Sequence, residues 1–320
     1  VHYPTDINLL WDAMRKTLET CAQLCQGEGL TDWRQSAYNL RRFKKLYRRV
    51  QQLKRSQSKD PDKRKTRQAE IEAAYRDYLA LAEAYLARAR DPRARLHIAC
   101  RLPEVLLVGL DGYMAHAERQ IAQIRRRVLF GERIPHAEKV FSIFEPHTEW
   151  INKGKAGVPV ELGLRVAVSE DQYGFILHHR VMEQTTDDQS AVALVKESCT
   201  RFPEITSASL DKGFHSPANQ AALAELIELP VVPKKGKRSA ADLERERDPE
   251  FIRLRRRHAA VESAINALEV HGLDVCPDHG IDGFTRYVAL AVVARNLHRL
   301  GTLLQAKEAA RERRRRKRAA

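Results

Sequence analysis

Two acidic residues stand where a carboxylate can do chemistry. Asp211 ends the apolar stretch 205–210, which predicts a strand. A carboxylate that follows a strand emerges at the edge of a sheet, where proteins built from strands and helices place their sites. Glu262 lies in a predicted helix, three residues from both Ala259 and Ile265, so we expect it near the apolar side. A carboxylate there is costly unless a cation or an opposite charge accompanies it.

Carboxylates from distant parts of a chain are the ligands that Mg²⁺ or Mn²⁺ takes beside a phosphate substrate. Two such ions about 4 Å apart activate a water or a 3′-hydroxyl and stabilise the leaving oxygen. A third carboxylate normally bridges the ions, and Glu145, after the strand-like stretch 140–144, is the best candidate within the chain. Two plainer interpretations stay open. Asp211 can be a turn residue, and Glu262 can pair with an arginine in the stretch 253–257.

The charge of the chain favours a polyanionic partner, and DNA first. The sequence has 56 Lys and Arg against 42 Asp and Glu, a net charge of +14. Neutralising the phosphates of a DNA backbone is the usual use of such an excess. The predicted DNA-contacting residues are Lys153, Lys155, Lys212, Lys234, Lys235, Arg257 and His258. A solvated polar surface is the alternative interpretation.

The elements that must position these residues change character near residue 135. Residues 1–135 carry apolar residues at helical spacing and predict a helical bundle. Alternation of period two in 160–168, followed by the apolar stretch 175–182, predicts a hairpin. The later expected elements are a helix over 188–200, strands over 205–210 and 229–233, and helices over 217–227, 249–270 and 284–305. Strands and helices around one sheet predict an α/β or α+β domain over 136–310, and the charge block 311–320 predicts a disordered basic tail.

Several classes of protein are disfavoured by the sequence. No stretch approaches the apolar length of a membrane span, and residues 1–20 lack the pattern of a signal peptide. The five cysteines are scattered and odd in number, which favours free thiols in a reducing compartment over a disulfide framework or a zinc site. We therefore expect a cytoplasmic protein with no membrane partner.

Four stretches resemble insertion-sequence transposases of the DDE superfamily, whose catalytic domain has a ribonuclease-H-like mixed sheet with helices. They are VHYPTDINLLWDAMR (1–15), EPHTEWINKGKAGVPVELG (145–163), DKGFHS (211–216) and the long stretch 255–301, which begins RRRHAAVESAINALEVHGLD. The resemblance implies that Asp211 and Glu262 are catalytic and hold a pair of Mg²⁺ or Mn²⁺ ions. It also implies a bacterial protein at the nucleoid, acting on DNA as a homodimer or a higher assembly.

In relatives of this type the first acidic residue lies on a strand just before the VHYPTD stretch. The resemblance therefore places that residue upstream of Val1, makes the chain an N-terminally truncated fragment, and makes residues 1–135 an insertion after the first sheet strand. The implied function is metal-dependent cleavage and strand transfer of DNA. Two alternatives stay open: an inactive DNA-binding remnant that lacks the first acid, and a nuclease on the same fold.

Overall fold

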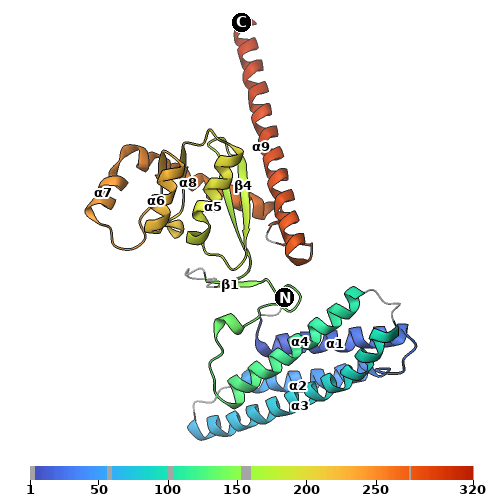
Figure 1. Ribbon diagram of the computed structural model, residues 1–320. Helices are drawn as coiled ribbons and strands as arrows, with labels where there is room; N and C mark the ends of the chain where they lie inside the picture. Colours follow the sequence, from blue (N-terminus) through green and yellow to red (C-terminus); the bar gives the residue numbers. More distant parts are fainter. Residues whose placement is uncertain (1–3, 56–59, 100–103, 153–159, 274, 320) are drawn as a thin grey trace. The chain divides into compact units, whose positions relative to one another are not determined.

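The computed structural model describes the chain except for residues 1–3, 56–59, 100–103, 153–159, 274 and 320 (Figure 1). It divides into unit 1, Val1–Trp150, and unit 2, Ile151–Ala320. The division falls later than the predicted boundary after residue 135, because Ile143 is buried in the helical core of unit 1. The same packing explains the apolar stretch 140–144, which forms bends and not the strand expected from its composition.

Unit 1 is a bundle of helices, drawn in blue to green in Figure 1. Its elements are α1 (Asp6–Gly27), α2 (Ser36–Arg55), α3 (Pro61–Ala99), α4 (Glu104–Ile124), the π-helical turn η1 (Arg125–Leu129) and the 3-10 turn η2 (His136–Glu138). Helix α1 packs against α4, α2 packs against α3, and α1 also contacts α2 and α3. The helical bundle predicted from the apolar spacing is thus confirmed for this part of the chain.

Aromatic rings form the centre of unit 1. Phe43 of α2 is fully buried and stacks on Tyr78 of α3, with 4.7 Å between ring centroids. Trp11 of α1 also stacks on Phe43, with 5.9 Å between ring centroids. Trp33 meets Tyr85 edge-on at 5.7 Å. Because each aromatic side chain buries a large apolar area, these contacts hold three helices of the bundle together.

Unit 2 combines short strands with longer helices. Its elements are β1 (Glu149–Asn152, which crosses the division), β2 (Val160–Gly163), β3 (Arg165–Glu170), β4 (Ile176–Met182), α5 (Asp187–Arg201), β5 (Ser207–Ser209), the 3-10 turn η3 (Lys212–Phe214), α6 (Pro217–Leu226), β6 (Leu229–Val231), α7 (Ala240–Arg247), α8 (Pro249–Leu268), the π-helical turn η4 (Glu269–Leu273) and α9 (Gly280–Ala319). The strands form three separate pairs, β1–β2, β3–β4 and β5–β6.

The predicted ribonuclease-H-like mixed sheet is wrong for the residues that the structure describes. Helices dominate both units, and every sheet has only two strands. The local signals were sound, because the hairpin β3–β4 pairs Arg165 with Met182 as the alternation predicts. What fails is the joining of the pairs: each strand hydrogen-bonds to a single neighbour, and the single strand expected over 160–168 divides into β2 and β3 between Gly163 and Arg165.

Helix α9 is fixed to the hairpin by polar as well as apolar contacts. The side chain of Asn296 accepts a hydrogen bond from the Ile176 backbone N–H and donates one to the Ile176 carbonyl, both 2.9 Å long. Arg299 Nε donates to the Tyr173 carbonyl at 2.7 Å. Val292 of α9, Ile176 of β4 and Leu268 of α8 form a small buried cluster beside them. Asn296, a polar residue on the apolar part of α9, thereby satisfies the backbone N–H and carbonyl of Ile176 in β4.

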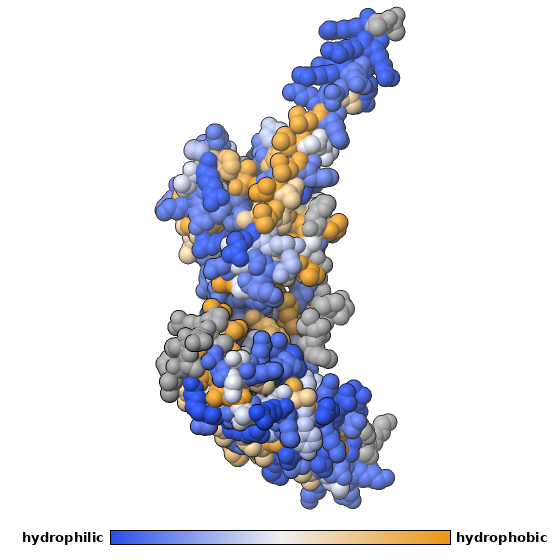
Figure 2. Space-filling model, turned by 90° about the vertical axis from the view of Figure 1, so that its right-hand side faces the viewer, coloured by the Kyte–Doolittle hydropathy of each residue, from blue (hydrophilic) through white to orange (hydrophobic). Residues whose placement is uncertain are grey.

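The outer face of α9 is apolar as far as residue 304. Figure 2 shows hydrophobic surface along this helix and hydrophilic surface at its C-terminal end. The basic stretch 311–319 continues the helix, in contrast to the predicted disordered tail, because Arg, Lys and Ala are strong helix formers. None of the described helices is both long enough and apolar enough to cross a membrane.

Candidate active site at the edge of the β5–β6 pair

Asp211 leaves the sheet at the carboxyl end of β5. Strands β5 and β6 are parallel, with Ser209 opposite Val231. The Leu210 backbone N–H extends the pairing to the Val231 carbonyl at 2.9 Å, and Asp211 then begins the turn η3. Parallel strands have their carboxyl ends at the same edge of the sheet. Asp211, after β5, and the segment that follows β6 therefore both leave the pair at this edge. The predicted place of this carboxylate, at a strand end, is confirmed.

The turn that carries Asp211 is held against two helix starts. The side-chain amide of Asn219, in α6, donates to the carbonyls of Phe214 at 2.9 Å and Asp188 at 2.6 Å. Gly213 faces the Asp187 carboxylate so closely that a Cβ there would lie 2.7 Å from an oxygen of Asp187. A side chain at this position would displace that carboxylate. The turn therefore keeps Asp211 in place through backbone contacts with α5 and α6.

Helix α8 supplies the second half of the site. The Asp248 carboxylate caps its start by accepting from the backbone N–H groups of Glu250 at 2.8 Å and Phe251 at 2.9 Å. Phe251, Ala264 and Leu268 are the buried side chains along the helix, and α8 contacts both β5 and β6. The side chain facing the turn of Asp211 along this buried stripe is that of His258, which is 21% exposed.

Glu262 does not lie on the buried face of α8. Its side chain is exposed, and so are Ala259 and Ile265, on which the prediction of a core-side position rested. The apolar residues Ala259 and Ile265 predicted the wrong buried face for α8. The face that is buried carries Phe251, Ala264 and Leu268, and the polar His258 lies along it. No arginine in the stretch 253–257 forms an ion pair with Glu262 among the described residues, and Arg253 pairs instead with Glu250.

His258 of α8 contacts Asp211. Its Nε2 lies 3.1 Å from Asp211 Oδ1, and Glu262 follows one helical turn later on α8. The hydrogen bond to Asp211 raises the pKa of His258 against the effect of burial, and the Ser209 backbone and the charge of Glu262 raise it further. The same hydrogen bond lowers the pKa of Asp211, whose side chain is 75% exposed. The geometry is that of a histidine ring in contact with one exposed carboxylate, with a second exposed carboxylate one helical turn further along α8.

The predicted DNA-contacting cations fall into three groups. Lys212, Lys235 and Arg257 are exposed in unit 2. Lys234 is engaged inside the protein: its ammonium lies 3.9 Å from Asp242, and its backbone N–H donates to Glu246 at 2.7 Å. Lys153 and Lys155 lie outside the described residues. The structure thus leaves three of the predicted lysines and arginines exposed to solvent, whereas His258 is paired with Asp211.

Glu145, the candidate third acid, belongs to unit 1. It follows a bend and not a strand, so the argument that placed it at a sheet edge does not hold. Its backbone N–H donates to Ser142 Oγ at 3.0 Å, and its carboxylate lies 3.6 Å from His147 Nε2. The role of Glu145 in a shared site stays a prediction.

The donor set fits a divalent cation only in part. The exposed oxygens of Asp211 and Glu262 are the ligands that Mg²⁺ or Mn²⁺ prefers, and their exposure leaves positions for water and a phosphate. Within the described part of the chain, no three His, Cys, Asp or Glu side chains gather at ligand spacing. His258 also occupies one oxygen of Asp211, so a cation there would compete with an imidazolium.

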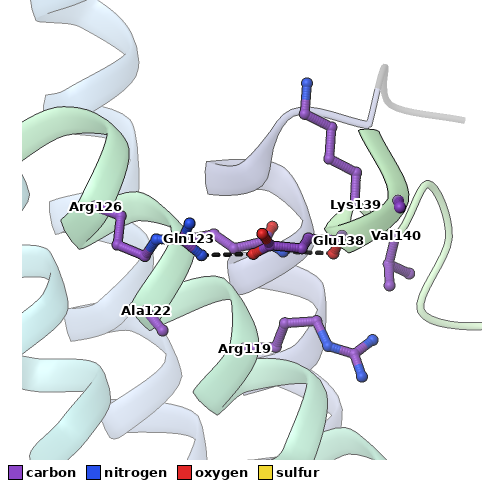
Figure 3. A pocket seen from close by; sticks show the side chains of 8 residues that line it. Arg119, Ala122, Gln123, Arg126, Glu138, Lys139 and Val140 are labelled. Atoms are coloured by element: carbon purple, nitrogen blue, oxygen red, sulfur yellow. Dashed lines mark hydrogen bonds and ion pairs between the residues drawn. The ribbon is translucent and has the colours of Figure 1, made fainter. Parts of the chain in front are cut away.

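A hollow of about 360 Å³ lies in unit 1, between the end of α4 and the segment around η2 (Figure 3). Arg126 there pairs with Glu138 at 2.5 Å and with Glu132 at 2.7 Å, and Gln123 donates to the Glu138 carbonyl at 2.6 Å. Arg119 extends away from this network in the figure. Because Arg126 is paired with Glu132 and Glu138 within the hollow, we interpret these contacts as structural: they hold η2 against the end of α4.

Two residues of the site gave weaker signals in the sequence. The pairing of His258 with Asp211 was not predicted, although its position one turn before Glu262 was available as a signal. Asp187, whose carboxylate meets Gly213, carried no signal beyond standing at a helix start.

Compared with known protein families, curated proteins and solved structures, the chain shows no match to any of them. The resemblance to transposases therefore remains a prediction from the residues quoted above.

Proposed function

We propose that this chain acts on DNA as a transposase, with metal-dependent strand cleavage and strand transfer as its chemistry. The observation that carries the proposal is the contact of Asp211 with His258 at an open edge of unit 2, with Glu262 one helical turn after His258 on α8. Asp211, after a strand, and Glu262, on a helix, are both exposed in unit 2, and so are Lys212 and Arg257. The sequence resemblance to DDE transposases supports the same assignment, although the sheet expected from that resemblance is not found in the described residues. The net charge of +14 also supports it.

The roles follow from chemistry and exposure. Asp211 and Glu262 would hold the Mg²⁺ or Mn²⁺, which when bound supplies positive charge at a phosphodiester and lowers the pKa of a water or hydroxyl. Lys212 and Arg257 are exposed next to these acids and would hold the DNA backbone. His258, as the partner of Asp211, keeps that carboxylate ionised and oriented before DNA arrives. Such a protein would act in the bacterial cytoplasm, at the nucleoid.

Assembly on DNA as a homodimer or larger complex is part of the proposal. Leu290, Val293, Leu297, Leu300 and Leu304 are exposed on one face of α9, spaced alternately by three and four residues. That spacing is the seam of paired helices, so a second copy is the partner it suits. We expect Leu297→Glu to shift the protein toward monomer in analytical ultracentrifugation, whereas the exposed Leu243→Glu on α7 leaves the distribution unchanged. Equal distributions for wild type and Leu297→Glu would contradict this assignment.

The experiment for the chemistry uses the product of the complete gene and DNA carrying element ends. We expect cleavage and strand transfer in Mg²⁺ or Mn²⁺, lost by at least a hundredfold in Asp211→Asn and in Glu262→Gln, since an amide is a poor ligand for these ions. Glu225→Gln, an exposed acid on α6, is the matched control and keeps the wild-type rate. Wild-type transfer by Asp211→Asn would refute the assignment.

A DNA-binding protein without catalysis is the second candidate. The pairing of His258 with Asp211 favours it, because the carboxylate is already neutralised by a side chain. The same experiment separates the candidates. Tight DNA binding with no cleavage in either metal supports the binding protein, and cleavage without joining supports a nuclease.

A further inference from the structure

Helix α2 of unit 1 has an unusual charge. Its 20 residues contain eight Lys and Arg and no Asp or Glu. These residues are Arg41, Arg42, Lys44, Lys45, Arg48, Arg49, Lys54 and Arg55. Like charges three or four residues apart destabilise a helix, so this composition costs stability and calls for an explanation outside the helix itself.

The cations are divided between the sides and the outer face of α2. Phe43, Tyr47 and Val50 turn into the core, together with Asn39. Arg41, Lys45 and Arg48, spaced by four and three residues, lie on the opposite side of the helix and are exposed. The outer face of α2 is therefore a row of cations, and the packing of Phe43 and Tyr47 in the core fixes the side of the helix on which this row lies.

Most arginines elsewhere on unit 1 are neutralised by acids. Arg90 pairs with Glu118 at 2.7 Å, Arg93 with Asp111 at 2.6 Å, and Arg125 with Glu83 at 2.6 Å. On α2, within the described residues, Arg49 alone forms such a pair, with Asp77 at 3.2 Å. An ordinary solvated surface mixes both signs. The outer row of α2 instead keeps its charge available to an external anion.

We infer that the outer face of α2 binds the phosphate backbone of duplex DNA. The complementarity is one of charge and shape: a straight helix of 20 residues is about 30 Å long, and the row offers a cation every turn along a duplex that carries regularly spaced phosphates. This surface shares its partner with the proposed function but none of its residues. It would hold DNA whether or not Asp211 and Glu262 support cleavage.

The test compares two triple variants of the whole chain in EDTA, so that no cleavage contributes. The first replaces Arg41, Lys45 and Arg48 by Gln, and the second replaces Arg90, Arg93 and Arg125 by Gln. Both lose three positive charges from unit 1, but only the first set is unpaired. Gln is a good helix former. The fluorescence of Trp11 and Trp33, measured in a Trp150→Phe background, checks that unit 1 folds in both variants.

Affinity for a duplex is measured by fluorescence anisotropy over a range of salt concentrations. Each phosphate contact contributes about 0.9 to the slope of log affinity against log salt, so the first variant is expected to lower that slope by about 2 to 3 and to bind roughly tenfold or more weakly at low salt. The second variant is expected to keep a slope within about 1 of the wild type. Glu225→Gln, an exposed acid on α6 outside the proposed site, is measured alongside and leaves the slope unchanged.

Three results would overturn the inference. The first is an unchanged slope in the α2 variant. The second is an equal loss in both triple variants, which would show that only net charge matters. The third is retained DNA affinity with a loss of binding to duplex RNA or to anionic phospholipid vesicles, which would assign the face to another polyanion. A loss confined to the α2 variant supports the inference even if the protein has no strand-transfer activity.

Discussion

Unit 1 and unit 2 are stabilised in different ways. The buried side chains of unit 1 form one continuous cluster that joins all four helices, with stacked aromatic rings linking α1, α2 and α3. Those of unit 2 fall into three smaller clusters, around α5 and α6, around β3 and β4, and around α9. Polar contacts, such as those of Asn296 with Ile176, link the elements in unit 2 where apolar packing is thin.

The difference bears on function. A single close-packed core makes a rigid support, which suits a surface that acts through the fixed spacing of charges, as on the outer face of α2. Small clusters joined by polar contacts open more readily. Asp211 and His258 come from elements that belong to such clusters, so their distance is set by a turn and a helix face and not by a large core. Unit 2 is therefore the place where a partner or a second copy can still change the packing.

The largest expected effect is in the core of unit 1. Phe43→Ala removes a ring that stacks on both Trp11 and Tyr78, and we expect it to lower the free energy of unfolding of unit 1 by about 3 to 5 kcal/mol. Trp11 and Trp33 pack in the core of unit 1, whereas Trp150 lies on β1 at the division between the units. Chemical denaturation followed by tryptophan fluorescence in a Trp150→Phe background therefore measures unit 1. Phe130→Ala is the control, since that ring is 67% exposed. A comparable loss in both variants would contradict a single close-packed core.

A smaller effect is expected from the matching change in unit 2. Leu223 of α6 is fully buried, but its cluster has few members and can collapse around a cavity. We expect Leu223→Ala to cost about 2 to 3 kcal/mol, near the lower end for such a truncation. Hydrogen exchange of α6 amides would report it, and the fluorescence transition of unit 1 would stay in place. A shift of both transitions together would show that the two units unfold as one.

The sequence predicted individual elements better than their assembly. The periodicity of apolar residues correctly located the bundle, the hairpin β3–β4 and the strand end before Asp211. It could not show which strands pair, because pairing depends on contacts between residues far apart in the chain. Ile143 illustrates the limit: an apolar run that resembles a strand is buried among helices. Glu262 illustrates another, since the polar His258 occupies the stripe that apolar residues were expected to mark.

The smallest and most local effect concerns the Asp211–His258 pair, which marks the site in unit 2. The pKa of His258 is raised, so its contribution to stability is complete below about pH 6.5, the usual value for histidine, and is lost as the pH rises through the raised value. The pKa of Asp211 is lowered, so its contribution is present above about pH 4 and is lost as the pH falls through the lowered value. The pair therefore stabilises unit 2 most between these limits.

Titration of the histidine ring signals by NMR would measure this directly. We expect His258 to titrate above the usual value in the wild type and to move down in Asp211→Asn, because its main stabilising charge is removed. Glu262→Gln is expected to move it down less, since that charge is the smaller cause. His179 is the internal control: burial, the neighbouring His178 and a nearby arginine lower its pKa, and neither substitution touches it. An ordinary titration of His258 in the wild type would separate Asp211 from α8 and remove the contact on which the proposed site depends.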